Sequence, residues 1–373
     1  MKSVATQKYV KDLNSSGSKP NNILEYLIKF QISDYFALDN IIIYDTLSDG
    51  QTFLTSYVPY LYIHLPNGTI VSLAINLNNP NQFQSTYNTT TGITYLKFNI
   101  TRILIDNGYN GVLEGCNYYS NETAISQLFG NLTFRSQINT NYAVNNSRIV
   151  SNDLIRNSID IKANLANQTA NVTDSSGTRI NIVAPTSNKI IIEINGKPIS
   201  PDSNIIIRPG DNITFSLEIN VPTTNLNNFV VIDYLPIPFL NALQFYTGQL
   251  QNTTLTIPIS GQWRLGEKDT LTALTGILPY LIVDPTQNTL TFNYGNISLP
   301  SQQSSIVHIL FTVTATGFPM DDALNLANLL NIKYENTENI VFSDNSIVNF
   351  VTGQPVLSIE KKCNSKERFG SWE

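Results

Sequence analysis

An alternating stretch near the middle of the chain constrains its fold most. From Arg208 to Pro236 the sequence reads RPGDNITFSLEINVPTTNLNNFVVIDYLP. Its first half alternates apolar and polar side chains, with the apolar ones at Ile213, Phe215, Leu217, Ile219 and Val221. A period of two over this length predicts a strand with one face on a core and the other in water. The apolar run from Phe229 to Ile232 predicts a second strand, which Pro236 ends because proline cannot donate to a sheet. The stretch therefore predicts one hairpin of an all-β sandwich.

The same hairpin occurs earlier in the chain, at Glu25–Gly50. Four alternating apolar residues of this copy, Tyr26, Ile28, Phe30 and Ile32, match Phe215, Leu217, Ile219 and Val221. Three residues around the second apolar run also match, since Asn40, Asp45 and Leu47 fall where Asn228, Asp233 and Leu235 fall. Alternation alone is common, but these shared flanking residues indicate an internal repeat, which is strong evidence of architecture.

The chain has 373 residues, which is enough for two or three domains with separate cores. We predict tandem β-sandwiches with long polar loops, the first at residues 1–180 and the second at residues 181–354. Residues 355–373 are expected to be the truncated start of a third repeat followed by an unstructured tail. Met1–Asn22 is polar, so the first unit is expected to lack its opening strand. Ala166–Thr178 is the expected boundary segment, and Met320–Leu330 is expected to form a short helix.

Composition excludes several functional classes. The net charge is -6 and no cluster of Lys or Arg occurs, so nucleic acid is not an expected partner. The two cysteines, Cys116 and Cys363, cannot form a disulfide framework or a zinc site. No apolar stretch approaches the length of a transmembrane helix, and the first twenty residues lack the apolar core of a signal peptide.

The sequence resembles the conserved-repeat domain family of large surface proteins found in bacteria, archaea and giant viruses. The matching segments are IRPGDNITFSLEI, VVIDYLPIPF, SDYFALDNIIIYDTLSDGQTF and PVLSIEK, and the resemblance spans about Asn22 to Lys361. It implies an immunoglobulin-like β-sandwich architecture, and some relatives are described as isopeptide-forming fimbrial or adhesin-type proteins. The chain departs from the pattern at both ends, so we expect it to be a fragment of a longer repeat array.

Side chains for enzyme chemistry are scarce. The two histidines, His64 and His308, lie in apolar strand runs where alternation predicts that they face solvent. No nucleophile elbow, zinc-protease, P-loop or dinucleotide motif occurs. The acidic pairs Asp45/Asp49 and Asp321/Asp322 do not form an EF-hand loop, although calcium at a domain junction is left open. We therefore expect no enzyme activity and no cofactor.

One covalent site is a candidate, an intramolecular isopeptide bond in the second unit. Such a bond needs a lysine on an early strand, an asparagine on a late strand and a carboxylic acid between them. Burial would lower the pKa of the amine and raise that of the acid, so that a neutral amine attacks the amide. The fitting residues are Lys189, Asp233 and either Asn328 or Asn331, of which Asn331 is chosen. The alternative is that Asp233 caps the end of its strand and Lys189 is a surface residue.

The expected function is a non-catalytic structural or adhesive module, located extracellularly or on a virion surface. Its expected partners are neighbouring repeats or other surface proteins, with glycans as a further candidate. Twelve N-x-[ST] triplets permit glycosylation, but so Asn-rich a sequence produces most of them by chance. The competing hypothesis is a carbohydrate-binding or glycan-processing domain with its site on loops such as Asn76–Thr91. Neither Trp263 nor Trp372 lies in a run that suggests a sugar platform.

Overall fold

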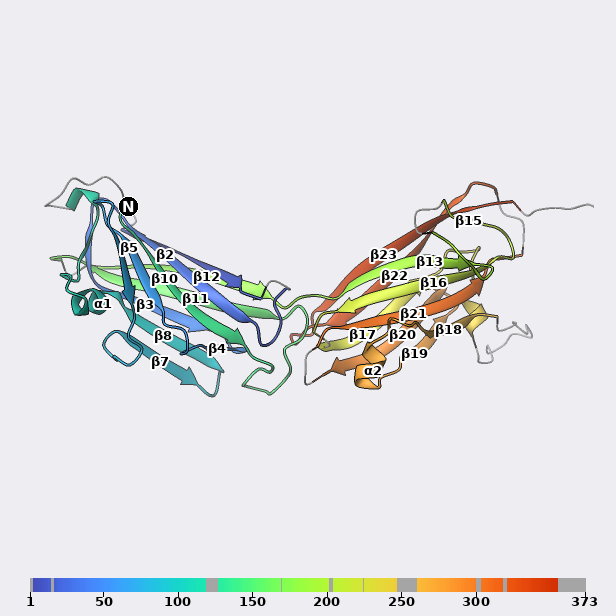
Figure 1. The fold of residues 1–373 in the computed structure, drawn as a ribbon, viewed down its shortest axis with the longest axis horizontal. Helices are drawn as coiled ribbons and strands as arrows, with labels where there is room; N and C mark the ends of the chain where they lie inside the picture. The colour runs from blue at the N-terminus through green and yellow to red at the C-terminus, as the bar shows by residue number, and fades with distance from the viewer. Residues whose placement is uncertain are drawn as a thin grey trace, which may run out of the picture.

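The computed structural model contains two β-sandwiches arranged end to end (Figure 1). It describes residues 3–14, 17–118, 127–168, 170–200, 204–223, 225–246, 260–299, 303–317 and 321–354. The expected third-repeat segment, with Cys363 and Trp372, lies outside the described residues. One buried hydrophobic cluster runs from Val4 to Ile182 and a second from Ile191 to Phe350, so each sandwich has its own core.

Two sheets form the first sandwich, in the strand orders β1-β2-β10-β5-β6 and β12-β11-β3-β8-β7. A short strand, β4, pairs with β10, and another, β9, pairs with β3. The elements are β1 (Val4–Asp12), β2 (Ile23–Ile32), β3 (Ala37–Leu47), β4 (Gln51–Phe53), β5 (Tyr60–His64), β6 (Ile70–Ala74), β7 (Phe83–Asn88), β8 (Ile93–Asn99), α1 (Ile100–Asp106), β9 (Leu113–Glu114), the 3-10 turn η1 (Cys116–Tyr118), β10 (Phe129–Ile138), β11 (Leu154–Leu165) and β12 (Asn171–Asn181).

The second sandwich has the strand orders β14-β13-β16-β21-β18 and β15-β23-β22-β17-β20-β19. Its elements are β13 (Thr186–Ile194), β14 (Lys197–Pro198), β15 (Ile206–Ile207), β16 (Asn212–Val221), β17 (Asn225–Tyr234), η2 (Ala242–Phe245), β18 (Gln262–Leu265), α2 (Leu271–Thr275), β19 (Tyr280–Asp284), β20 (Thr289–Ser298), β21 (Ser305–Thr314), β22 (Asn325–Glu335) and β23 (Val341–Thr352).

The repeated hairpins form the centre of each core, as the alternation predicts. The eight matched apolar residues are at most 2% exposed: Tyr26, Ile28, Phe30, Ile32, Phe215, Leu217, Ile219 and Val221. All eight lie on β2 and β16, which pair with equivalent neighbours, β1 and β10 in one sandwich and β13 and β21 in the other. The predicted all-β class and the predicted burial are therefore both confirmed.

Three segments differ from the prediction. Residues 4–12, expected to be loosely attached, form β1, so the first sandwich does have an opening strand. Residues 325–335 form β22, where a helix was expected over Met320–Leu330. The expected boundary segment, Ala166–Thr178, instead contributes to a hairpin, because β12 pairs along almost the whole of β11. In the first two cases a polar residue at an inward position interrupts the apolar alternation.

One side of each sandwich is closed by side chains that bridge its two sheets. Asp174 on β12 accepts a hydrogen bond from the backbone N–H of Thr6 at 2.7 Å, and Ser176 accepts one from that of Lys8 at 3.1 Å. The second sandwich repeats this clamp, in which Asp344 on β23 accepts from Ser187 N at 2.7 Å and Ser346 from Lys189 N at 2.9 Å. These contacts satisfy N–H groups of β1 and β13 that face away from the paired neighbour, which protects the edge strand.

A hydrogen-bonded junction joins the sandwiches. The carboxylate of Asp153, only 1% exposed, accepts from the Val150 N–H at 2.9 Å and from the N–H and hydroxyl of Thr337 at 2.9 and 2.8 Å. The amide of Asn152 donates to the Tyr334 hydroxyl at 2.6 Å. The bonds to Thr337 and Tyr334 join buried or half-buried groups of the two sandwiches, so the mutual arrangement of the sandwiches is structurally specified.

Candidate functional site

A buried lysine, aspartate and asparagine meet between the sheets of the first sandwich. Lys8 on β1 is 4% exposed, and its Nζ donates to Oδ2 of Asp45 on β3, which is 1% exposed. The same Nζ donates to Oδ1 of Asn157 on β11 at 2.7 Å. The amine also lies over the rings of Tyr26 and Phe134, at 5.0 and 5.1 Å from their centroids. The lysine is thus held against an amide carbonyl in an apolar, aromatic setting.

The second sandwich holds an equivalent cluster. Lys189 on β13 donates from Nζ to Oδ2 of Asp233 on β17, and both side chains are fully buried. Its amine lies over the rings of Phe215 and Phe311, at 5.0 and 5.7 Å from their centroids. Asn328 on β22 is also fully buried, and it contributes to the electrostatic surroundings of the Asp233 carboxyl.

The acceptor chosen from the sequence, Asn331, does not join Lys189 and Asp233. The inward-facing positions of β22 include Asn328, Leu330 and Ile332, so the odd-numbered Asn331 points to the other face of the sheet. There its Nδ2 donates to Oδ1 of Asn345 on β23 at 2.6 Å. Asn328, the other asparagine considered in the sequence, is the one that faces the core.

Strand register places the two clusters at equivalent positions. Lys8 pairs with Ile28 and Lys189 with Leu217, which are matched residues of the repeated hairpin. Asp45 pairs with Ile159, two residues after Asn157. Asp233 pairs with Leu330, two residues after Asn328. Each asparagine therefore stands diagonally across from its aspartate, at a spacing within the reach of polar side chains.

Burial sets the protonation of both pairs. Loss of solvation lowers the pKa of Lys8 to about 8, against the opposing effect of Asp45, and raises the pKa of Asp45. Loss of solvation likewise lowers the pKa of Lys189 to about 8 and raises the pKa of Asp233. Both shifts move each pair toward the form in which the proton lies on the acid and the amine is neutral.

Several polar atoms of the clusters have no hydrogen-bond partner among the described residues. These atoms are Asp45 Oδ1, Asn157 Nδ2, Asp233 Oδ1, and Asn328 Oδ1 and Nδ2. A buried polar atom without a partner typically costs about 1–3 kcal/mol. Condensation of lysine with asparagine would remove the amine charge and expel the amide nitrogen as ammonia. The arrangement thus suits an isopeptide bond chemically, and the unreacted cluster is costly.

The first-sandwich cluster was missed in the sequence, although a signal for it was present. The internal repeat aligns Asp45 with Asp233, so the candidate role of Asp233 already pointed to Asp45. Lys8 was hidden because it occupies an inward position of β1 and breaks the alternation that would have revealed the strand. Asn157 is likewise the inward polar residue near the start of β11.

Other residues singled out in the sequence have structural surroundings of their own. His308 is 7% exposed, not solvated as expected, and its imidazole contacts the Ser216 hydroxyl and the Lys268 N–H. His64 stacks on Phe129, with 4.0 Å between ring centroids. Trp263 is half-buried against the Phe292 ring. Cys116 forms no disulfide within the described residues.

Within the described residues, no group of three or more His, Cys, Asp or Glu side chains is placed to hold a metal ion. Asp49 instead accepts backbone N–H groups of Gly50, Ala143 and Val144. In the same part of the chain, no helix has the length and apolar character needed to cross a bilayer.

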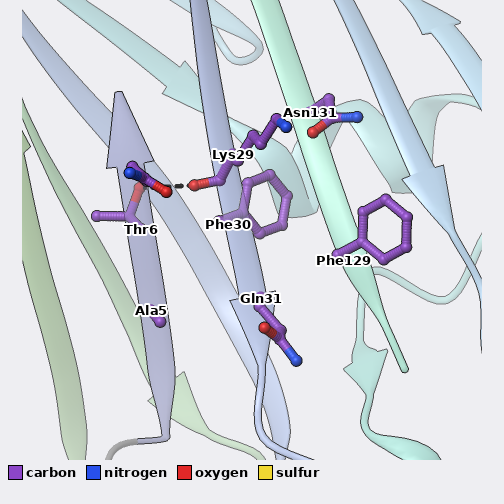
Figure 2. Close-up of a pocket in the computed structure, with 8 residues that line it drawn as sticks. Ala5, Thr6, Lys29, Phe30, Gln31, Phe129 and Asn131 are labelled. Atoms are coloured by element: carbon purple, nitrogen blue, oxygen red, sulfur yellow. Dashed lines mark hydrogen bonds between the residues drawn. The ribbon is translucent and has the colours of Figure 1, made fainter. Parts of the chain in front are cut away.

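A surface groove of about 550 Å³ lies over the first sandwich (Figure 2). It crosses three neighbouring strands and is lined by Gln7 on β1, Lys29 and Gln31 on β2, and Phe129 and Asn131 on β10. The groove lies on the sheet, not on a loop such as Asn76–Thr91. Asn131 Oδ1 is buried and has no partner among the described residues.

Comparisons with solved structures find bacterial surface proteins. The C-terminal domain of the Streptococcus agalactiae AgI/II polypeptide BspA is 12% identical, with a TM-score of 0.31, over 94% of this chain and 100% of that one. The C-terminal domain of the Streptococcus pyogenes antigen I/II-family protein AspA is 11% identical, with a TM-score of 0.32, over 94% and 99%. BcpA, the major pilin subunit of Bacillus cereus, is 10% identical, with a TM-score of 0.28, over 95% and 69%.

No protein-family model and no curated protein sequence matches this chain. At TM-scores near 0.3 the structural likenesses carry no argument about binding or chemistry. The functional argument therefore depends on this chain's own residues.

Proposed function

We propose that the chain is a non-catalytic structural and adhesive module of a surface protein, in which each sandwich closes one Lys–Asn isopeptide bond. The duplicated cluster of buried lysine, aspartate and asparagine carries this proposal. In the first sandwich the bond joins Lys8 to Asn157, and in the second it joins Lys189 to Asn328. A covalent tie between an early and a late strand suits a rod that separates a binding surface from its anchor.

The reaction is a single intramolecular transfer that balances without a cofactor. The neutral Nζ attacks the Cγ carbonyl of asparagine, and the C–Nδ2 bond breaks. The aspartate receives a proton from the attacking nitrogen and delivers one to the departing Nδ2, which leaves as ammonia. The raised pKa of Asp45 and of Asp233 suits this shuttle, because burial makes each carboxylate a better proton acceptor than an exposed aspartate.

Intact-mass measurement of the denatured, purified chain tests the proposal. The wild-type chain is expected to weigh less than its sequence by the mass of two ammonia molecules. Asn157→Ala and Asn328→Ala should each retain one loss, and the double variant none. Peptide mapping should recover a branched peptide that joins Lys8 to Asn157 and another that joins Lys189 to Asn328.

Asn331→Ala is the matched control, because Asn331 lies on the same strand as Asn328 but faces away from Lys189. It should keep both mass losses. A wild-type mass equal to that of the sequence would refute the crosslinks. A loss that disappears in Asn331→Ala but persists in Asn328→Ala would restore the acceptor chosen from the sequence.

The groove of Figure 2 favours one second candidate, glycan binding by the first sandwich. Gln7, Gln31 and Asn131 offer amide groups to sugar hydroxyls, and Phe129 offers an aromatic face for sugar C–H groups. A glycan array probed with the wild-type chain and with Asn131→Ala tests this candidate. Saturable binding that Asn131→Ala abolishes would support glycan binding. Absence of binding would leave the structural module as the one proposed function.

A further inference from the structure

The proposed crosslinks determine which part of the chain transmits tension, and this inference depends on them. A pull applied before Lys8 and after Asn328 would cross from Lys8 to Asn157, follow the backbone to Lys189 and cross again to Asn328. Residues 9–156 and 190–327, which are 148 and 138 residues long, would be bypassed. Between the two crosslinks only the 31 residues from 158 to 188 would carry tension along the backbone.

This intervening segment contains β12, which is held more weakly than its neighbours. β12 pairs with a single strand, β11, and lies at the edge of its sheet. None of its eleven residues is fully buried, and only Val172 and Ile180 among its apolar side chains pack against the core. By contrast, the adjoining half of β11 pairs on both sides and buries Ile159, Ile161 and Ala163.

The clamp of Asp174 and Ser176 fixes β12 in place without covalent bonds. Asp174 Oδ2 and Ser176 Oγ accept the N–H groups of Thr6 and Lys8, across the boundary between the sheets. Removing β12 and the connection that follows it would expose these two N–H groups and two half-buried apolar side chains, and it would also draw the fully buried Ile182 out of the core cluster. The rest of the cluster stays closed around the crosslink. Local opening of such a peripheral element requires less free energy than global unfolding.

We propose that β12 and the connection to β13 form a reversible extension element, a further mechanical function built into the crosslinked rod. Tension detaches β12 from β11 and from the clamp, and residues 166–185, which end where β13 begins, become extended. These 20 residues add at most about 70 Å of contour at the length of an extended chain. When tension falls, β12 pairs again in the same register, because β11, β1 and their side chains have not moved.

Single-molecule force spectroscopy on the full chain, held at its two ends, tests the proposal. The wild-type chain should show a short, repeatable extension between the crosslinks, of at most about 70 Å at first and never above about 110 Å for all 31 residues. Detachment of β23, which follows Asn328 in the chain, is expected to give a similar short extension. Variants are therefore needed to distinguish the extension of β12 from that of β23.

Two variants identify the element. The pair Ser158→Cys and Gly177→Cys joins directly opposed residues of β11 and β12, and under oxidising conditions its disulfide should abolish the release of residues 159–176. Under reducing conditions the event should return. Asp174→Ala with Ser176→Ala should lower the force of the event without changing its length, because the clamp is lost while the segment is the same.

The outcomes separate this inference from the proposed crosslinks. Asn157→Ala should add the 148 bypassed residues, about 500 Å of contour, to the extension of the first sandwich. If mass measurement shows both crosslinks but no short event occurs, or the oxidised disulfide leaves the event unchanged, the extension element is refuted and the crosslinks stand. If the wild-type chain lacks the mass losses and extends by whole sandwiches, the crosslinks themselves are refuted.

Discussion

Asp45 and Asp233 occupy equivalent places on β3 and β17, and each accepts a hydrogen bond from the lysine amine on the first strand of its own sandwich. They are 1% and 0% exposed, and burial raises the pKa of both carboxyls. A cap at the end of a strand does not require this burial, and Lys189 is not on the surface. The two copies of the repeat thus share a buried lysine–aspartate pair as well as a hairpin.

Loss of one crosslink should destabilise one sandwich and spare the other. Asn157→Ala opens a covalent loop of 148 residues, and the chain-entropy estimate for such a loop is about 4–5 kcal/mol. Differential scanning calorimetry should therefore show a lowered transition for the first sandwich and an unchanged one for the second. Asn328→Ala should give the reverse.

The control for these two variants is Asn331→Ala, which removes an outward amide from β22 and leaves the crosslink in place. Its transitions should shift far less than those of Asn328→Ala. Equal transitions in the wild-type chain and Asn157→Ala would mean that no covalent bond closes the first sandwich.

The stability of an uncrosslinked sandwich should rise with pH in the alkaline range. In Asn157→Ala the Lys8 amine stays unreacted, with a pKa lowered by burial to about 8 from 10.5. The folded state then binds fewer protons than the unfolded state between these values, so the free energy of unfolding increases as pH rises from about 8 to 10.5. The expected gain is about 1–3 kcal/mol by urea unfolding.

Lys8→Met in the Asn157→Ala background is the control, because methionine keeps an apolar chain of similar length and removes the amine. It should lack the rise between these pH values. If both variants show the same pH dependence, Lys8 does not carry a lowered pKa in the folded sandwich.

Much of the fold was predictable, because a strand such as β2 buries one side chain in two and displays that pattern in the sequence. The strand that was missed, β1, and the strand that was assigned as helix, β22, carry Lys8 and Asn328 of the buried clusters. Lys8 and Asn328 occupy inward positions of β1 and β22 at which an apolar side chain would be expected. The apolar alternation that predicts a strand is therefore interrupted at these two positions. The choice between Asn328 and Asn331 depended on which face of β22 turns inward, and the sequence left that open.

Each clamp aspartate should protect one backbone N–H from solvent. In Asp174→Ala the Thr6 N–H loses its acceptor at 2.7 Å, so its hydrogen exchange should quicken, while the exchange of the Ser187 N–H stays the same. Asp344→Ala should quicken exchange at Ser187 alone. The loss of one such bond corresponds to about 1–2 kcal/mol, or roughly a tenfold change in local protection. Unchanged exchange at Thr6 in Asp174→Ala would show that the clamp does not close this edge.

Asp153 should determine how rigidly the two sandwiches are joined. Asp153→Ala leaves the Val150 N–H and the N–H and hydroxyl of Thr337 without their acceptor, so the junction is expected to loosen. Small-angle scattering and residual dipolar couplings should then report a broader distribution of inter-sandwich angles, with each sandwich internally unchanged.

Arg156→Ala is the matched control, since the Arg156–Glu338 ion pair also spans the junction but its side chains are 52% and 50% exposed. Solvent screening makes such a pair weak, so this variant should keep the wild-type distribution. Equal broadening in both variants would mean that the buried carboxylate has no special role in fixing the angle between the sandwiches.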